Sequence, residues 1–265
     1  MKTKLFILLL FTSFTAFAQL EKERKWQIGV NINTVEPITE AGFDYAVNQT
    51  RIFNDATAHR TDKSTSFGIN LSYQTKDKCV LRLVAKMTQY KIDERYDSRE
   101  AREITTAPSS DYILDTGYIR QSVYTISPGI VWNFSYKKLN IYGGFQLVYK
   151  KYSPTEIDLR YAFYNTSNDS LTSAKYYIIR EGGGYSLGLG PVTGFSVNVF
   201  KNFSIGAEFS SAYTYYKRGG ETSWFLQFTY PPQNAGNSGT IISHGTYEAY
   251  KFSSVLSSVN ISYNF

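Results

Sequence analysis

Three charged residues stand out because they share a face with small and polar residues in alternating segments. Arg82 and Lys86 lie in one such segment, and Glu208 lies in another, at 203–213. A lone charge in a low-dielectric interior is very costly, so opposite charges there are expected to pair. We expect Arg82, Lys86 and Glu208 to form a salt-bridge cluster that fills an interior space. The alternative is a gated ion path in which Glu208 swaps between the two cations.

The two histidines, His59 and His244, are the other residues that invite a chemical reading. With Ser243, Asp62 and Glu248 nearby in sequence they suggest a hydrolytic or metal cluster. Nucleophilic catalysis needs a nucleophile, a base and an orienting acid held in hydrogen-bond geometry. Both histidines fall in long connectors that do not promise such geometry. We therefore expect solvated histidines, no catalytic residue and no metal site.

A glycine run and an aromatic run complete the candidates. Gly182-Gly183-Gly184 precedes a strand rather than a helix, so it is no phosphate loop, and we expect no cofactor. A second run follows a turn expected at 217–220, and exposed aromatic side chains of this kind often mark a contact site. Protruding strand edges can likewise accept a partner strand. We expect a recognition tip formed by Trp224, Phe225, Phe228 and Tyr230.

Eight segments that alternate with period two must position these residues, and such alternation indicates β-strands. One face carries Leu, Ile, Val and aromatic residues, while the other carries Gly, Ser, Asn and Thr. Small polar residues suit the inside of a narrow barrel and an apolar outer band suits lipid, whereas a soluble barrel reverses the two faces. The segments are 26–33, 66–73, 81–88, 124–134, 139–149, 187–199, 203–213 and 255–265.

The connectors between these segments alternate between short and long. The short ones are 75–78, 136–138 and 201–202, and the long ones are 36–64, 91–117, 151–183 and 217–247. Short periplasmic turns and long extracellular loops are typical of membrane barrels. The sequence thus predicts an all-β fold, a closed antiparallel up-and-down transmembrane β-barrel of eight strands, or less favourably ten. Strand-like stretches at 157–164, 174–180 and 223–230 predict protruding hairpin extensions.

Aromatic residues fall where the two membrane interfaces of such a barrel are expected, because aromatic girdles hold rings at headgroup level. Those near the short turns are Trp26, Phe134, Phe203 and Phe265, and those about a membrane span away are Tyr90, Tyr124, Tyr149 and Tyr213.

The amino terminus indicates export. Lys2 and Lys4 precede an apolar run, and Ala16-Phe17-Ala18 supplies a small-x-small cleavage pattern. We expect residues 1–18 to be a cleaved signal peptide and 19–265 a single barrel domain. Removing the two lysines leaves 26 basic against 22 acidic residues. That excess is scattered and forms no basic stripe, so nucleic acid is not an expected partner.

With its alternating strands, alternating turn lengths and terminal Tyr263-Asn264-Phe265, the chain resembles the small OmpA/OmpX-type outer-membrane β-barrels, including those of Bacteroidetes-like bacteria. The resemblance implies a Gram-negative outer membrane, contact with its lipid and lipopolysaccharide, and insertion by the barrel-assembly machinery. It implies a non-enzymatic envelope or surface-interaction role through extracellular loops, with an envelope or extracellular protein as the unknown partner. The alternatives are a narrow transport pore or a PorT-like secretion accessory, and a lipid A-modifying enzyme based on the two histidines.

Overall fold

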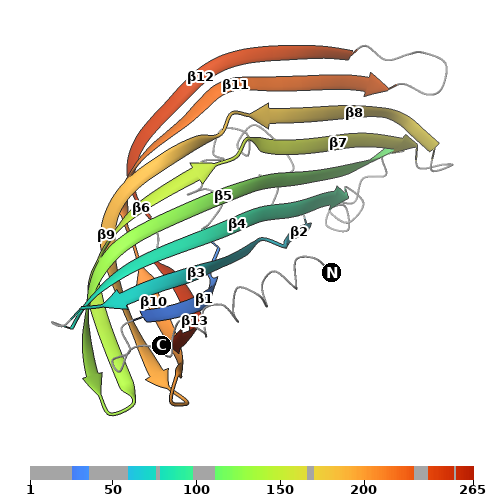
Figure 1. Ribbon diagram of the computed structural model, residues 1–265. Coiled ribbons are helices and arrows are strands. Elements are labelled where there is room, and N and C mark those ends of the chain that lie inside the picture. The colour runs from blue at the N-terminus through green and yellow to red at the C-terminus, as the bar shows by residue number, and fades with distance from the viewer. Residues whose placement is uncertain are drawn as a thin grey trace, which may run out of the picture.

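The computed structural model describes residues 26–35, 59–75, 78–97, 111–165, 170–229, 238–253 and 255–265. The signal peptide expected at residues 1–18 lies outside them and stays a prediction. Within the described residues the chain forms one antiparallel sheet (Figure 1). Its strands are β1 (Trp26–Asn33), β2 (His59–Asp62), β3 (Thr65–Gln74), β4 (Cys79–Asp97), β5 (Asp111–Tyr136), β6 (Leu139–Tyr152), β7 (Thr155–Asn165), β8 (Ser170–Glu181), β9 (Gly184–Asn198), β10 (Phe203–Ser210), β11 (Tyr213–Thr229), β12 (Ser238–Phe252) and β13 (Leu256–Asn264).

Eight of these strands pair in an unbroken series. The order is β1, β3, β4, β5, β6, β9, β10 and β13, and β13 pairs in turn with β1. Each of the eight segments expected from the alternation contributes to one of them. The described part of the sheet nevertheless holds 13 strands, so the expected total of eight or ten was too low. The extra strands arise because the long connectors themselves form strands.

The extra strands build an extension of the sheet beyond the eight-strand series (Figure 1). The hairpin β7–β8 lies between the far ends of β5 and β11, and β12 pairs with β11 from Tyr213 to Gln227. The hairpins expected around 157–164 and 174–180 are therefore present. The stretch at 223–230 also continues a strand, but its return partner is the long β12. Among the described residues, no helix is long and apolar enough to cross a membrane.

The prediction of a turn at 217–220 is wrong, because β11 continues through these residues without reversing its direction. β11 pairs with β9 up to Arg218 and with β8 from Ser223, so the strand changes partner between the two. Gly219 and Gly220 lie at this point with φ of 130° and 114°. Glycine adopts positive φ without steric cost, which lets the strand bend without reversing.

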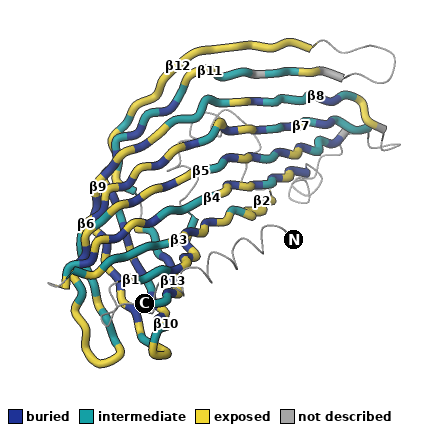
Figure 2. The backbone as a smooth tube through the Cα atoms, viewed as in Figure 1, coloured by how far each residue is buried: buried dark blue, intermediate teal, exposed yellow. Residues whose placement is uncertain are grey.

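The two faces of the eight-strand series differ in polarity, and the apolar face is the exposed one. Figure 2 shows exposed and buried residues following one another along these strands. On β5, Ile126 and Ile130 are 50% and 45% exposed, whereas Ser127 is 2% exposed. On β1 the buried residues are Gly29, Asn31 and Asn33. This is the reverse of a soluble barrel and is the arrangement of faces that the sequence predicts for a chain surrounded by lipid.

The polarity of the faces reverses farther along the same strands, although their alternation does not change. On β4, the buried residues change from Arg82 to Tyr90 and Ile92, while the exposed residues change from Leu83 to Gln89 and Lys91. On β5, Arg120 is exposed and its neighbour Ile119 is 1% exposed. Beyond this level the exposed residues of β4 and β5 include Gln89, Lys91, Arg95, Thr116 and Arg120, and buried apolar residues enter the inside, as in a protein surrounded by water.

An apolar core fills the inside of the extension at this level. It gathers side chains from β4, β5, β6, β7, β8 and β11, and Val35, Tyr161 and Tyr177 pack against it. Because strand residues of one parity share a face, Tyr90 and Ile92 lie on the same face of β4 as Arg82, and Ile119 and Val123 lie on the same face of β5 as Ser127. Its buried members are Tyr90, Ile92, Ile119, Val123, Tyr152, Ile157, Leu159, Ile179 and Tyr216.

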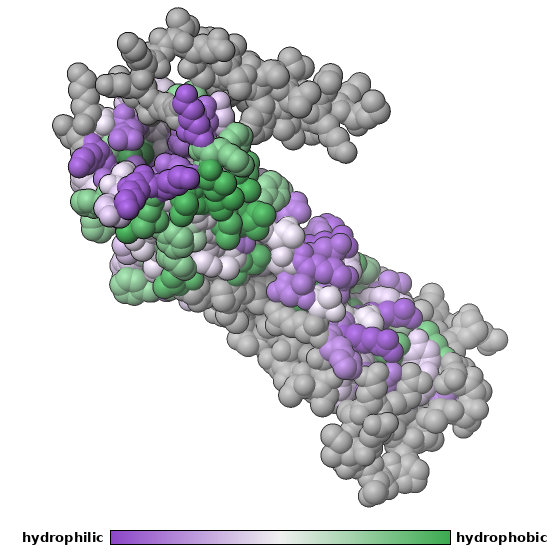
Figure 3. Space-filling view, turned by 90° about the horizontal axis from the view of Figure 1, so that it is seen from below, coloured by the Kyte–Doolittle hydropathy of each residue, from purple (hydrophilic) through white to green (hydrophobic). Residues whose placement is uncertain are grey.

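The exposed apolar residues form a band of defined height. On β5 it runs from Phe134 to Tyr124, and ten residues at about 3.3 Å each, tilted by about 40°, rise roughly 25 Å. That height matches the apolar band of outer-membrane barrels. Figure 3 shows hydrophobic residues gathered in one zone of the surface with hydrophilic residues beside it.

Aromatic residues mark both limits of this apolar band. Trp26, Phe134 and Phe203 are exposed at the short-turn limit, and Tyr124, Tyr149 and Tyr213 are exposed at the other. Tyr90 was wrongly expected among them. It is 4% exposed and points into the core, because it shares the inward parity of Arg82.

Candidate functional site

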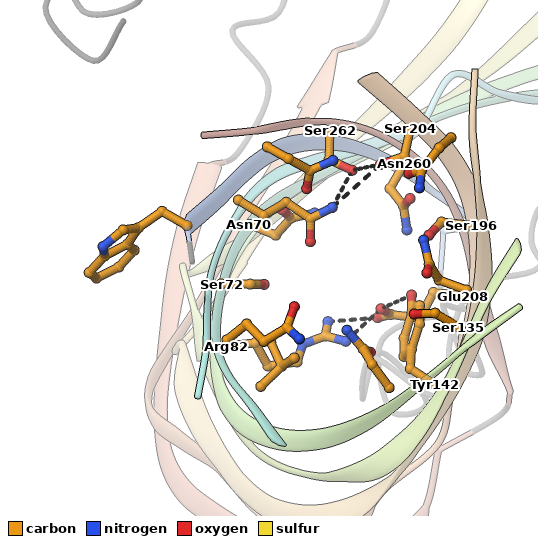
Figure 4. A pocket seen from close by; sticks show the side chains of 18 of the residues that line it. Asn70, Ser72, Arg82, Ser135, Tyr142, Ser196, Ser204, Glu208, Asn260 and Ser262 are labelled. Carbon is orange, nitrogen blue, oxygen red and sulfur yellow. Dashed lines mark hydrogen bonds and ion pairs between the residues drawn. The ribbon is translucent and has the colours of Figure 1, made fainter. Parts of the chain in front are cut away.

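A polar chamber of about 260 Å³ lies inside the eight-strand series, toward the short turns (Figure 4). Its wall is made of the inward-facing small and polar residues of the strands. Carboxamides and hydroxyls dominate it, and these groups both donate and accept hydrogen bonds. The polar lining includes Gln27, Asn70, Ser72, Asn133, Ser135, Asn140, Ser196, Asn198, Ser204, Asn260, Ser262 and Asn264.

Arg82 and Glu208 form a bidentate ion pair in this chamber (Figure 4). Arg82 Nη1 donates to Glu208 Oε2 at 2.6 Å and Nη2 donates to Oε1 at 2.9 Å. Their side chains are only 6% and 7% exposed. Two parallel N–H···O bonds are the strongest geometry that a guanidinium and a carboxylate can adopt.

Tyr142 adds a third bond to the pair, since its hydroxyl donates to Glu208 Oε2 at 2.9 Å. Val80, Val131 and Val192 form a small apolar cluster against Tyr142. The carboxylate of Glu208 is thus bound by β4 on one side and by β6 on the other. The three polar side chains join strands that are far apart in sequence and span the interior at this level.

Lys86, the third residue of the expected cluster, lines a second and smaller cavity of about 40 Å³ on the far side of the ion pair. Ser66, Thr88, Gln146 and Lys150 line the same cavity. The structure therefore brings Arg82 and Glu208 into contact and places Lys86 in the neighbouring space. Inward positions on β4 occur at every second residue, so Lys86 is the second inward residue after Arg82.

Hydrogen bonds along the chamber wall hold its side chains in place. Gln27 Nε2 donates to Ser262 Oγ at 2.8 Å, and Asn70 Nδ2 donates to Asn31 Oδ1 at 2.8 Å. Asn70 Oδ1 is buried and has no protein partner. A polar cavity with an unused acceptor is a suitable place for ordered water.

Beyond the second cavity the apolar core closes the interior, and a polar network crosses it. Arg218 Nη2 donates to Thr155 Oγ1 at 2.6 Å, and Gln121 Nε2 donates to the same oxygen at 3.0 Å. The Arg218 guanidinium also lies 5.8 Å from the ring centre of Tyr152. Along the interior, the chamber is thus followed by the ion pair, then by the second cavity, and then by the packed core.

Charges on the extension are paired differently, because they are open to water. Lys217 Nζ lies 2.7 Å from Glu248 Oε1, and the hydrogen bonds that Lys217 and Tyr215 donate lower the pKa of Glu248. Lys63 donates to Asp93 at 2.7 Å and lowers the pKa of that carboxyl. Burial instead raises the pKa of Glu181, and Arg218 opposes this only in part.

The histidines lie on strands at the two ends of the sheet order. His59 is on β2 and pairs in register with Arg95, and His244 is on β12 opposite Glu221. The acids that were considered as their partners are engaged elsewhere. Glu248 pairs with Lys217, and Asp62 Oδ1 accepts a bond from the Ser64 amide. No group of metal-binding side chains occurs among the described residues.

The expected aromatic tip is only partly within the described structure. The backbones of Trp224 and Phe228 pair with β8, and Phe225 lies opposite Ile178 and Thr240. The side chains of Trp224 and Phe228, and the whole of Tyr230, lie outside the described residues. The tip itself therefore stays a prediction.

Two features of the site were missed in the sequence. Tyr142 shares one face of the 139–149 segment with Asn140, Gly144 and Gln146, but nothing in that segment points to Glu208. The reversal of polarity was readable, because Tyr90 and Ile92 continue the parity of Arg82 while Lys91 continues that of Leu83. A scan for a change of facing polarity within one alternating run would have found it.

No protein-family model and no curated protein sequence matches the chain. The solved structures that are similar to the chain include small outer-membrane β-barrel proteins. Neisserial surface protein A shares 14% identity over 91% of this chain and 97% of that one, with a TM-score of 0.37. OprG from Pseudomonas aeruginosa shares 12% over 92% and 97%, with a TM-score of 0.40. A major outer membrane protein from Thermus thermophilus shares 12% over 91% and 99%, with a TM-score of 0.39. Similarity this low carries no argument about what the chain does.

Proposed function

We propose that the chain is an outer-membrane β-barrel whose lumen is plugged and whose long-connector end serves an envelope or surface-interaction role. In this proposal the series from β1 to β13 closes as an eight-stranded transmembrane barrel. The extension of β4, β5, β7, β8, β11 and β12 stands in water on the extracellular side. A single domain over 19–265 would follow export by the signal peptide.

The observation that carries the proposal is the reversal of polarity along continuous strands. Leu83 is exposed and Arg82 buried at one level of β4, whereas Lys91 is exposed and Ile92 buried at another. A strand that crosses from lipid into water needs this reversal, because exposed residues face hydrocarbon first and water afterwards. A chain wholly in water would expose the apolar band to solvent at great cost.

The interior supports a structural rather than a conducting role. The bidentate pair of Arg82 and Glu208 spans the lumen, and the apolar core that contains Ile119 and Ile157 lies behind it. An eight-stranded barrel is just wide enough for side chains to fill. Because the ion pair and the apolar core both fill the lumen, the extension is the part of the molecule that is available to a partner.

The band can be tested by placing a charge inside it and just beyond it. Ile130→Arg puts the charge near the middle of the band, and arginine at a bilayer midplane costs about 2–4 kcal/mol. Ser122→Arg, on the same face of β5 beyond Tyr124, costs near zero. Urea unfolding of each variant in lipid vesicles measures the difference. Equal effects of the two substitutions would refute the membrane assignment.

A narrow transport pore is the second candidate, because the chamber of about 260 Å³ is obstructed at its inner end by the ion pair and Tyr142. If the pair were the only barrier, Glu208→Ala would open a path past Tyr142. Planar-bilayer conductance of the wild type and of Glu208→Ala separates the two. Near-zero traces from both favour the plugged barrel, and a conductance that appears in the variant favours the pore.

A further inference from the structure

The extension has two edge strands, and these differ in length and in charge. One edge is β2, which has four residues, His59-Arg60-Thr61-Asp62, and is followed by the Lys63–Asp93 ion pair. A short, charged edge strand is a common protection against unwanted pairing. The other edge is β12, which is 15 residues long. It pairs with β11 alone among the described strands.

β12 carries none of the usual protections of a free edge. It has no proline, and its pairing with β11 continues in one register from Phe252 to Ser238 without a bulge. Its only fixed charges are Glu248 and Lys251, and both lie in the part closest to the barrel. The segment Ser238–Tyr247 holds no Asp, Glu, Lys or Arg. A long edge strand without charges is a template for strand addition.

Both faces of this segment are open. Ile241 and Ile242 are 67% and 56% exposed and point to opposite faces, and Tyr247 is 56% exposed. Taking roughly 200 Å² for each large side chain, the three expose on the order of 350 Å². An added strand would cover them together with the free backbone edge. This area fits a small, reversible interface of less than about 1,200 Å² in total.

The position of the β12 edge decides whether a binding partner would approach from water or from lipid. Figure 1 places β12 at the far side of the extension from the β5–β6 turn, with its free edge away from the barrel. In the proposed membrane orientation this edge faces away from the lipid, so a strand added to it would lie on the aqueous side. The aromatic residues nearest the lipid band, Tyr250 and Phe252, pack on Tyr213 instead.

We propose that Ser238–Tyr247 of β12 binds an extended, uncharged segment of another polypeptide by strand addition on the aqueous side. The proposal rests on the proposed surface-interaction role and names its partner class. Main-chain hydrogen bonds along the edge supply the affinity, and alternate apolar side chains of the partner meet Ile241 on one face and Ile242 on the other. A charged partner strand would desolvate its charges against these residues.

The test uses the full chain in detergent micelles and a fluorescein-labelled decapeptide of alternating Thr and Val. We expect saturable binding in the micromolar range and at least tenfold slower amide exchange in Ser238–Tyr247. A decapeptide of alternating Thr and Pro is the matched probe, because proline removes the N–H donors. Equal binding of both peptides would overturn the strand-addition geometry.

The matched variants add two lysines at or away from the edge. Ile241→Lys with Ile242→Lys should weaken peptide binding at least tenfold, because charges on both faces oppose pairing. Gln89→Lys with Thr116→Lys adds the same charge at exposed positions of β4 and β5 and should leave binding unchanged. Equal loss in both double variants would show non-specific binding and overturn the proposal.

Two further results bear on the occupant. If the wild type forms dimers without peptide and Ile241→Lys with Ile242→Lys abolishes them, the occupant is a second copy and the proposal is wrong. If amide exchange in Ser238–Tyr247 slows on transfer to lipid vesicles alone, the edge contacts lipid and the proposal is wrong. Vesicle flotation tests the proposed function separately, because it measures whether the wild type and the same double variant insert into lipid. Failure to insert in the wild type would overturn that function, whatever the peptide does.

Discussion

The ion pair of Arg82 and Glu208 gives the sharpest quantitative expectation. Arg82→Met would leave the Glu208 carboxylate with only the bond from Tyr142 in a site where the side chain is 7% exposed. Breaking a buried pair by removing one partner costs about 3–5 kcal/mol. The adjoining chamber of about 260 Å³ admits water, which lowers the penalty toward about 3 kcal/mol.

The double variant separates pairing from burial. Arg82→Met combined with Glu208→Leu removes both charges and fills similar volume, and such replacements are often neutral or stabilising. We therefore expect the double variant to unfold within about 1.5 kcal/mol of the wild type, closer to it than either single variant. A coupling energy of about 3 kcal/mol or more follows from these two expectations.

Urea unfolding in detergent micelles, followed by tryptophan fluorescence, measures these free energies. Ser72→Ala, in the wall of the same chamber, is the control and should change stability by less than about 1 kcal/mol. Additive effects of Arg82→Met and Glu208→Leu would refute the reasoning, because independent sites do not couple. It would mean that each charge is solvated separately and that the pair does not plug the lumen.

Three further expectations concern the extension. Ile157→Ala removes a side chain that is 0% exposed and should cost about 2–5 kcal/mol, seen as faster proteolysis of the extension while the lipid-facing strands stay protected; uniform proteolysis would contradict a separate core. Gly219→Ala forces a Cβ against the Gly245 carbonyl oxygen at a positive φ and should speed amide exchange across β11–β12, whereas Gly143→Ala, with nothing within 4 Å, should not; equal exchange in both would contradict the bend. Because burial raises the folded-state pKa of Glu181, its ionisation opposes folding at neutral pH, so Glu181→Gln should be more stable than the wild type at pH 7. That gain should vanish as the pH falls below about 4.5, where the wild-type carboxyl is protonated in both states, and a gain that persists there would contradict the cause.

Much of the eight-strand series could be predicted from the sequence, because alternation is a local property. Ile126 and Ser127 reveal opposite faces simply by being neighbours in an extended strand. The short turns set the order of the pairs, and the pairing of β1 with β13 is the expected neighbourhood of the first and last segments. The small polar residues of the inward face also indicate a narrow interior.

The extension could not be predicted in the same way. β11 exchanges β9 for β8 at Gly219 and Gly220, and the glycine pair looks the same in sequence whether it turns the chain or bends it. β12 is the return strand of β11, but its segment Ser238–Tyr247 is rich in Gly, Ser and Thr and does not alternate between apolar and polar residues, so its length could not be predicted. The count of strands was too low for this reason.

The interior shows the same division. By itself the sequence determined that Arg82, Lys86 and Glu208 face inward, since side-chain parity follows from position along each strand. Only the tertiary structure decided which of them meet: Glu208 accepts two bonds from Arg82 and one from Tyr142, and Lys86 lines the next cavity. The physical reason is that parity fixes the face of a residue, whereas its height and its partner across the interior depend on the stagger of all the strands between them.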